Sequence, residues 1–163
     1  MKNNDILRRI RFTFNFSDSK MIAIFGLADY PVTRTQISDW LKKDDDPAYK
    51  NCNDNQLAAF LNGLISDRRG NREEPPPKPE KRLNNNIILR KLKIALDLKD
   101  EEIIDLLGLA ALPMSKHELS AFFRKPDHKN YRTCKDQVLR NFLRGLQMTY
   151  RTDIQPEAEF KWK

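Results

Sequence analysis

The sequence predicts an all-α protein of two tandem four-helix repeats, related by pseudo-twofold symmetry and joined by a proline-rich linker. Residues 49–64 (YKNCNDNQLAAFLNGL) return 82 positions later as residues 131–146 (YRTCKDQVLRNFLRGL). The same register extends back to Asn3 without an insertion, which indicates one fold unit present twice. Each unit contains four stretches with apolar residues at helical spacing, and capping residues stand at their ends.

The repeat also sets the predicted domain boundaries. The first repeat is expected over residues 1–69, the linker over 70–82, the second repeat over 83–150 and a loose C-terminal tail over 151–163. Four prolines among charged residues favour an extended polyproline II linker. A unit of about 65 residues is close to the lower limit for a self-sufficient core, so we expect the repeats to share buried surface.

The first helix of each repeat is predicted from Ile6, Leu7 and Ile10 and from their counterparts 82 positions later. Asn4 or Asp5 is its predicted N-cap, and Asn86 is the predicted N-cap in the second repeat. The basic residues of this helix fall off the apolar face and are expected at the surface. They are Arg8, Arg9 and Arg11 in the first repeat and Arg90, Lys91 and Lys93 in the second.

The second helix is expected to begin near Asp18 and Asp100, because an acidic first turn suits the helix dipole. Gly26 and Gly108 are predicted to end it, since glycine adopts the left-handed conformation that closes many helices. The third helix should start at a capping box in both repeats. These boxes are Thr33-x-x-Gln36 and Ser115-x-x-Glu118.

The fourth helix is expected to begin near Asp54 and Asp136 and contains a glycine, Gly63 or Gly145, near its middle. A mid-helix glycine costs about 1 kcal/mol relative to alanine. Because this cost appears in both repeats, we expect close approach of another helix there, with the pair that crosses the pseudo-twofold as one candidate.

A polar connection precedes the fourth helix. Tyr49 and Cys52 recur in it as Tyr131 and Cys134, and all four are expected to face inward. The cysteines should be buried and reduced, since disulfides are rare in cytosolic proteins. A lysine and an aspartate of the connection also recur, Lys43 and Asp45 as Lys125 and Asp127. They could form local salt bridges or caps, or they could be a repeated binding feature.

Composition favours a binding protein with an anionic partner. The chain has a net charge of +7 and a pI near 9.5, with 39% hydrophobic and 33% charged residues. Such an excess of positive charge favours an anionic partner without requiring one. No run of 18 apolar residues exists, so no membrane partner is expected, and the predicted localisation is cytoplasmic.

Motifs for catalysis are not found. The sequence lacks GxxxxGK[ST], GxGxxG and GxSxG. His117 and His128 occur near Cys134 in the second repeat only, because Thr35 and Asp46 replace the two histidines in the first repeat. We therefore expect no enzyme activity, no metal, no cofactor and no small-molecule substrate.

Surface recognition remains, and two classes of partner stay open. The second and third helices of each repeat resemble a helix-turn-helix pair, although six residues separate Gly26 from Thr33 and the usual turn has about 3–4. Together with the basic helix faces, this pair predicts DNA or RNA binding. The alternatives are a protein-interaction adaptor that uses the groove between the repeats, and a solvated charged surface without a partner. The candidate nucleic-acid-binding residues are Arg8, Arg9, Arg11, Arg34, Lys42, Lys43, Arg90, Lys91, Lys93, Lys116, Arg124, Lys125, Arg140 and Arg144.

Five sequence stretches together resemble one known family. They are NNDILRRIR, FLNGLISDRRG, NNNIILRKLKIAL, PDHKNY and FLRGL, and the resemblance covers residues 3–150. The chain is similar to the YehS-like family, small bacterial proteins built from two copies of a domain of unknown function. The resemblance implies the duplicated architecture and a bacterial cytoplasmic setting, and it implies no catalytic or ligand residues.

Overall fold

The computed structural model describes residues 1–70 and 75–151, and all regular structure in these ranges is helical. The helices of the first repeat are α1 (Asn3–Phe14), α2 (Asp18–Leu27), α3 (Arg34–Leu41) and α4 (Asp54–Arg69). Those of the second repeat are α5 (Asn85–Ala95), α6 (Asp100–Leu109), α7 (Lys116–Ala121) and α8 (Asp136–Tyr150). The predicted fold class is therefore confirmed.

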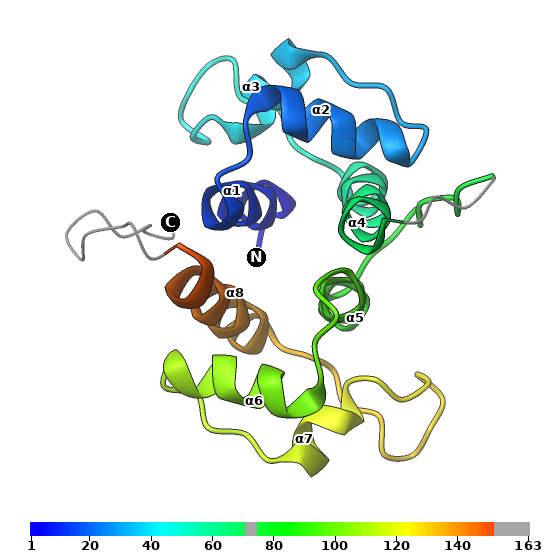
Figure 1. Cartoon of the computed structure of the whole chain (residues 1–163), viewed down its shortest axis with the longest axis vertical. Helices are drawn as coiled ribbons and strands as arrows, with labels where there is room; N and C mark the ends of the chain where they lie inside the picture. Colours follow the sequence, from blue (N-terminus) through cyan, green and yellow to red (C-terminus); the bar gives the residue numbers. More distant parts are fainter. Residues whose placement is uncertain (71–74, 152–163) are drawn as a thin grey trace.

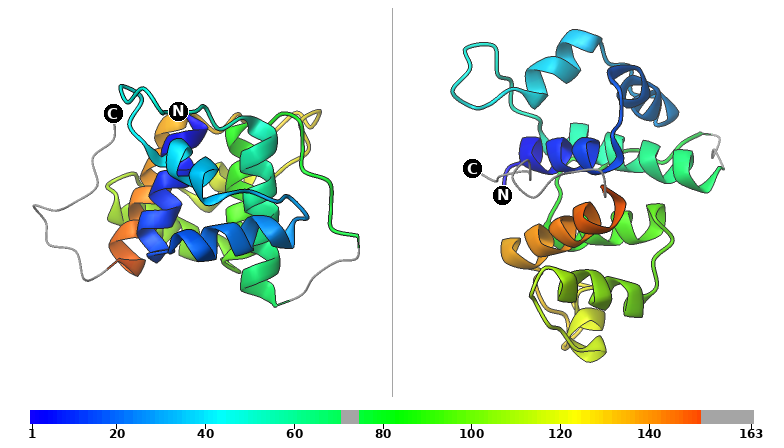
Figure 2. Two further views of the ribbon diagram at one scale, coloured as in Figure 1. Left: turned by 90° about the horizontal axis from the view of Figure 1, so that it is seen from above. Right: turned by 60° about the vertical axis from the view of Figure 1, so that its left-hand side comes forward.

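Four long helices form the centre of the molecule. Figure 1 shows α1, α4, α5 and α8 around the middle, with α2 and α3 at one end of the long axis and α6 and α7 at the other. Figure 2 shows the same stacking from two further directions. The repeats meet through α4 against α5 and through α1 against α8, a pair of contacts that the pseudo-twofold interchanges. One continuous apolar core runs through both repeats, as expected for units this small.

The mid-helix glycines allow α4 and α8 to touch another helix, but that helix belongs to the same repeat. A Cβ added to Gly63 would lie 1.8 Å from the carbonyl oxygen of Ile24 in α2. A Cβ added to Gly145 would lie 2.2 Å from the carbonyl oxygen of Leu106 in α6. The prediction of close approach was correct, and the suggestion that it occurs across the pseudo-twofold was wrong.

The predicted N-cap asparagines have a different role. Asn4 is fully buried; its amide donates to the carbonyls of Trp40 and Lys50 at 2.9 and 2.8 Å, and its oxygen accepts from the Cys52 amide at 3.0 Å. Asn86 makes the three equivalent bonds in the second repeat. These side chains therefore fasten the polar connection to the first helix. The N-cap positions are Lys2 and Asn84 instead.

Gly26 and Gly108 do not end the second helices. Both lie inside α2 and α6 and have no neighbouring atom within 4 Å of an added Cβ. The left-handed residues that follow these helices are Asp29 (φ 53°) and Ala111 (φ 62°). Asp and Ala thus hold a conformation that usually selects glycine, whereas the glycines one turn earlier are ordinary helical residues.

Other local predictions were correct. Both predicted capping boxes are present, at Thr33 and Ser115. Helices α4 and α8 begin at Asp54 and Asp136, and both cysteines are buried and free. Tyr49 and Tyr131 are only partly buried.

Two arginines join the repeats in a symmetric manner. Arg151 donates to the carbonyl oxygen of Phe12 at 2.6 Å and to Asn15 Oδ1 at 3.3 Å, so it caps the end of α1. Its counterpart Arg69 donates to the carbonyl oxygen of Ile94 at 3.3 Å at the end of α5. Each repeat therefore satisfies the last carbonyls of the first helix of the other repeat.

The linker contacts the first repeat where the structure describes it. Asn55 on α4 donates to the carbonyls of Pro79 and Glu80, and the Leu83 amide donates to Asp54 Oδ2 at 2.8 Å. Of the tail predicted over 151–163, Arg151 is bound to α1, and residues 152–163 lie outside the described residues.

Candidate nucleic-acid interface

The connection before the fourth helix differs sharply in charge between the repeats. Residues 124–135 contain five basic residues and one acidic residue, a net charge of +4. The equivalent residues 42–53 contain three of each and are neutral. We call residues 124–135 the basic loop. Because equivalent buried asparagines, Asn4 and Asn86, fasten the two connections, the charge difference lies in the side chains and not in the way the loops are held.

Seven of the candidate basic residues form ion pairs with aspartate or glutamate side chains of the same chain. Ion pairs of this kind leave little net positive charge for an external phosphate. The pairs with N–O distances below 3.5 Å are Arg8–Asp5, Arg11–Asp18, Arg34–Asp18, Lys42–Asp39, Lys91–Glu80, Lys93–Asp100 and Lys116–Glu101.

Arg9 corrects the prediction that the whole basic row of the first helix is exposed. It is fully buried between the repeats, and its Nη1 donates to Gln147 Oε1 on α8. It lies on the side of α1 that faces α8, so it cannot reach a partner in this structure. Arg144 on α8 is exposed.

Of the remaining candidates, Lys43, Arg90, Arg124 and Lys125 lie in no ion pair within the described ranges, whereas Arg140 interacts with the carboxylate of Asp136. Lys43, Arg90 and Lys125 are exposed, and Arg124 and Arg140 are partly buried. The basic loop adds three exposed basic residues that our sequence reading missed. They are Lys129, Arg132 and Lys135.

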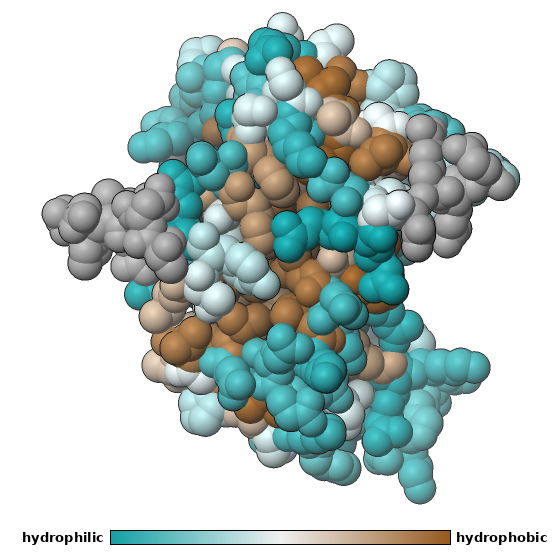
Figure 3. Space-filling view, in the orientation of Figure 1, coloured by the Kyte–Doolittle hydropathy of each residue, from teal (hydrophilic) through white to brown (hydrophobic). Residues whose placement is uncertain are grey.

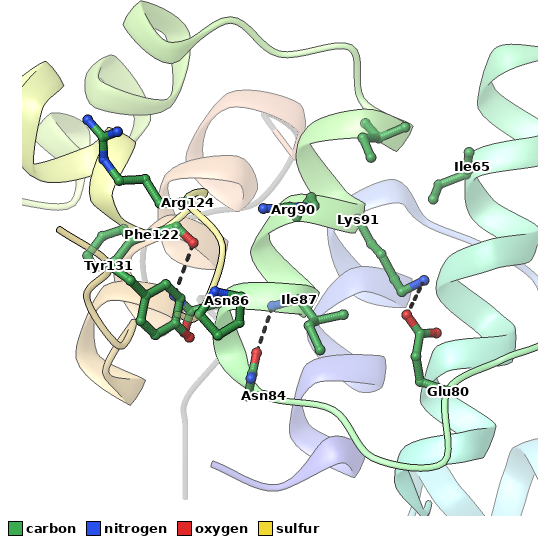
Figure 4. Close-up of a pocket in the computed structure, with 12 residues that line it drawn as sticks. Ile65, Glu80, Asn84, Asn86, Ile87, Arg90, Lys91, Phe122, Arg124 and Tyr131 are labelled. Carbon is green, nitrogen blue, oxygen red and sulfur yellow. Dashed lines mark hydrogen bonds and ion pairs between the residues drawn. The ribbon is translucent and has the colours of Figure 1, made fainter. Parts of the chain in front are cut away.

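A groove runs along the outer face of α5 beside the basic loop. It has a volume of about 280 Å³ and lies between Ile65 of α4 on one side and Phe122 and Tyr131 on the other. Figure 4 shows Arg90 and Lys91 between these two sides, with Glu80 of the linker next to Lys91. We call it the α5 groove. Its lining joins apolar, aromatic and basic side chains from both repeats.

The floor of the α5 groove comes from one helical face. Ile87, Arg90, Lys91 and Ile94 are spaced at i, i+3, i+4 and i+7, so they share one side of α5. Arg90 donates from Nη2 to the carbonyl oxygen of Phe123 and remains exposed. Lys91 is held by Glu80 at 3.0 Å and by Asn62 at 2.6 Å. Arg90 and the neighbouring Arg124 therefore supply the uncompensated charge of the groove.

The equivalent face of the first repeat is lined by different side chains, and a pocket of about 390 Å³ lies beside its Arg8 and Phe12. Asp5 stands where the second repeat has Ile87, and its carboxylate pairs with Arg8 at 3.3 Å. Arg8 also donates to the carbonyls of Leu41 and Lys42, at 3.2 and 2.8 Å. The guanidinium of Arg151 covers the ring of Phe12 at 4.5 Å from its centroid. The pseudo-symmetry therefore holds for the backbone and is broken in the side chains at this site.

The helix-turn-helix-like pairs lie at the two ends of the long axis, as Figure 1 shows. The first residue of each third helix contacts the preceding helix: Arg34 pairs with Asp18 at 3.4 Å, and Lys116 pairs with Glu101 at 2.9 Å. The Lys116 hydrogen bond lowers the pKa of Glu101. DNA reading by these helices stays a prediction.

The surface carries several apolar patches. On the face shown in Figure 3, apolar side chains are exposed over the central helices and near the upper end, with polar side chains between and around them. Among residues 1–70 and 75–151, the most exposed large apolar residues are Leu109 (53%), Met148 (44%), Tyr150 (42%) and Ile94 (41%). Among the helices that the structure describes, none has the length and apolar character needed to cross a membrane.

Comparison with known proteins agrees with the duplication. The family model described as "Protein of unknown function (DUF1456)" matches twice, over residues 3–70 and 85–152. The chain is similar to "Uncharacterized protein YehS" of Escherichia coli (strain K12), with 44% identity over 147 residues that cover 90% of this chain and 94% of that protein. No solved structure matches the chain. The chain therefore belongs to the DUF1456 family and carries the family domain in two tandem copies.

Proposed function

We propose that this protein is a non-catalytic, cytoplasmic nucleic-acid-binding protein whose contact surface is the basic loop of the second repeat together with Arg90. The observation that carries the proposal is the difference of +4 between two loops that the repeat makes equivalent. A charge difference at matched positions is not required by the common fold, because the first repeat forms the same loop without it. A polyanion is the partner that this surface suits.

The pairing pattern supports the same surface. Lys125, Lys129, Arg132 and Lys135 are exposed, and within the described ranges none of them lies in an ion pair. Each could neutralise a phosphate and release a condensed counterion, which is the main source of non-specific affinity for nucleic acid. In the first repeat, by contrast, Lys2 pairs with Asp44 of the neutral loop at 3.0 Å, and Lys42 pairs with Asp39.

The helix-turn-helix-like pairs contribute less to this proposal. The leading basic residues Arg34 and Lys116 are engaged with acids of the helix before them. The proposal therefore assigns the first contact to phosphates and not to base edges, and it predicts weak dependence on duplex sequence.

A matched pair of double variants tests the proposal. Lys125→Ala/Arg132→Ala removes two charges from the basic loop, and Lys43→Ala/Lys50→Ala removes the two charges at the equivalent positions of the neutral loop. Fluorescence anisotropy with a labelled oligonucleotide over a salt series gives the affinity and its salt dependence. The slope of log K against log salt should flatten by about 0.7–0.9 for each lost phosphate contact in the first variant. The second variant should keep the wild-type slope.

Two results would contradict the proposal. Equal losses in both variants would show that the charge difference between the loops is irrelevant. Absence of binding by the wild-type protein at low salt would remove nucleic acid as the partner and leave the protein-interaction adaptor as the alternative.

A further inference from the structure

We infer that the α5 groove holds an unpaired base of a single-stranded nucleic acid, with the neighbouring phosphates on Arg90 and Arg124. This inference rests on the proposed function and makes it more specific, because it selects single strands over duplexes. Figure 4 shows the groove that would hold the base.

The groove offers a base the contacts that single-strand-binding proteins use. Ile87, Ile94 and Ile65 provide apolar surface, and Phe122 and Tyr131 line the opposite side. Tyr131 is partly exposed and lines the groove, so its ring is available to stack on a planar base. Stacking on aromatic side chains beside a cationic groove is the common mode of binding to single strands.

The charges of the groove suit a base that carries its own phosphates. Arg90 is exposed at the middle of α5, and Arg124 begins the basic loop next to it. Neither has a carboxylate at ion-pair distance among the residues with described positions. A simple apolar ligand would leave these two charges uncompensated, whereas a nucleotide unit matches both the apolar floor and the basic rim. A duplex would first have to extrude a base, which costs a few kcal/mol of stacking and pairing.

The first repeat provides an internal comparison. Its equivalent face has Asp5 in place of Ile87, and Arg8 is neutralised by that carboxylate. Substitution of Ile87 by Asp therefore converts one position of the α5 groove to the composition of the first repeat. An aspartate at this position stands in the first turn of α5, where the helix dipole favours it, so the variant should fold.

Three labelled probes separate the contributions of base and phosphate: an oligothymidine, an abasic strand of the same length, and a duplex of the same length. Wild-type protein should bind the oligothymidine at least about fivefold more tightly than the abasic strand, since stacking of one base contributes this much or more. The Ile87→Asp and Tyr131→Ala variants should bind the two strands equally. The reverse substitution in the first repeat, Asp5→Ile, should leave the ratio of the affinities for the oligothymidine and the abasic strand unchanged.

Each outcome decides between the two proposals. If wild-type protein binds all three probes equally and the variants do not change this, the base-holding groove is wrong and the phosphate surface of the basic loop stands. If none of the probes binds at low salt, the nucleic-acid proposal fails as a whole. If Tyr131→Ala does not fold, Ile87→Asp alone decides, because it keeps the loop intact.

Discussion

The contact between Gly63 and α2 makes a prediction whose sign is opposite to that of helix propensity. Replacement of Gly63 by Ala should stabilise an isolated helix by about 1 kcal/mol. In the folded protein the new Cβ would lie 1.8 Å from the carbonyl oxygen of Ile24, and it would have to move about 1.6 Å to reach ordinary contact at 3.4 Å. The obstacle is backbone and not the end of a flexible side chain, so α4 and α2 must separate.

Such overpacking typically costs about 1–3 kcal/mol, and a backbone obstacle belongs at the upper end of that range. After subtraction of the propensity gain, we expect Gly63→Ala to lower the free energy of unfolding by about 2 kcal/mol. Gly145→Ala should act in the same direction, because its Cβ would lie 2.2 Å from the Leu106 carbonyl oxygen. Urea unfolding followed by circular dichroism measures the effect as a lower midpoint at unchanged m-value.

Gly26 supplies the matched control. It lies within α2, on the helix that Gly63 touches, and an added Cβ would meet no atom within 4 Å. Gly26→Ala should therefore raise the free energy of unfolding by up to about 1 kcal/mol. A Gly63→Ala variant as stable as Gly26→Ala would refute the close packing of α4 on α2.

Three further predictions concern a buried asparagine, the buried cysteines and an arginine that joins the repeats. Asn86→Ala leaves a buried amide and two carbonyls without partners, so it should lower the free energy of unfolding by about 2–4 kcal/mol in chemical denaturation. The N-cap variant Asn84→Ala should lower the free energy of unfolding by about 1 kcal/mol. Equal losses in the two variants would contradict the role of Asn86. Burial raises the pKa of the Cys52 and Cys134 thiols to about 12, so the free energy of unfolding should fall as pH rises from 9 toward 12. At neutral pH, iodoacetamide should label the native protein only at the rate of unfolding. Rapid labelling of the native protein would show that the thiols are accessible. Arg151→Ala should lower the thermal midpoint by a few degrees, because it removes the hydrogen bonds to α1. Lys43→Ala on the exposed loop should leave the thermal midpoint unchanged. Equal midpoints for the two variants would show that Arg151 does not join the repeats.

Periodicity and internal repetition were sufficient to predict the fold class. Apolar residues at helical spacing and two capping boxes identify the helices without reference to tertiary contacts, and the second copy provides an independent check. The position of α1 was predicted, but Asn4 was mistaken for a cap. An asparagine that caps the helix and an asparagine that binds the polar connection can both stand beside the start of the helix in the sequence. Only the position of the polar connection shows that its side chain faces inward.

The candidate site could be predicted only in part for a related reason. A basic residue on a helix can be placed on a face, but periodicity does not say what covers that face. Arg9 is covered by α8 of the other repeat, and Arg11 is paired with Asp18 across a turn. The charge difference between residues 42–53 and 124–135 was present in the sequence, and an aligned comparison of the two repeats would have identified Lys129, Arg132 and Lys135.

Amide chemical-shift mapping during titration with an oligothymidine tests the central claim most directly, because it locates the contact surface without any substitution. The account predicts shift changes in residues 87–94 and 122–135 and none in the equivalent residues 5–12 and 40–53. Changes spread equally over both repeats, or confined to the starts of α3 and α7, would contradict it.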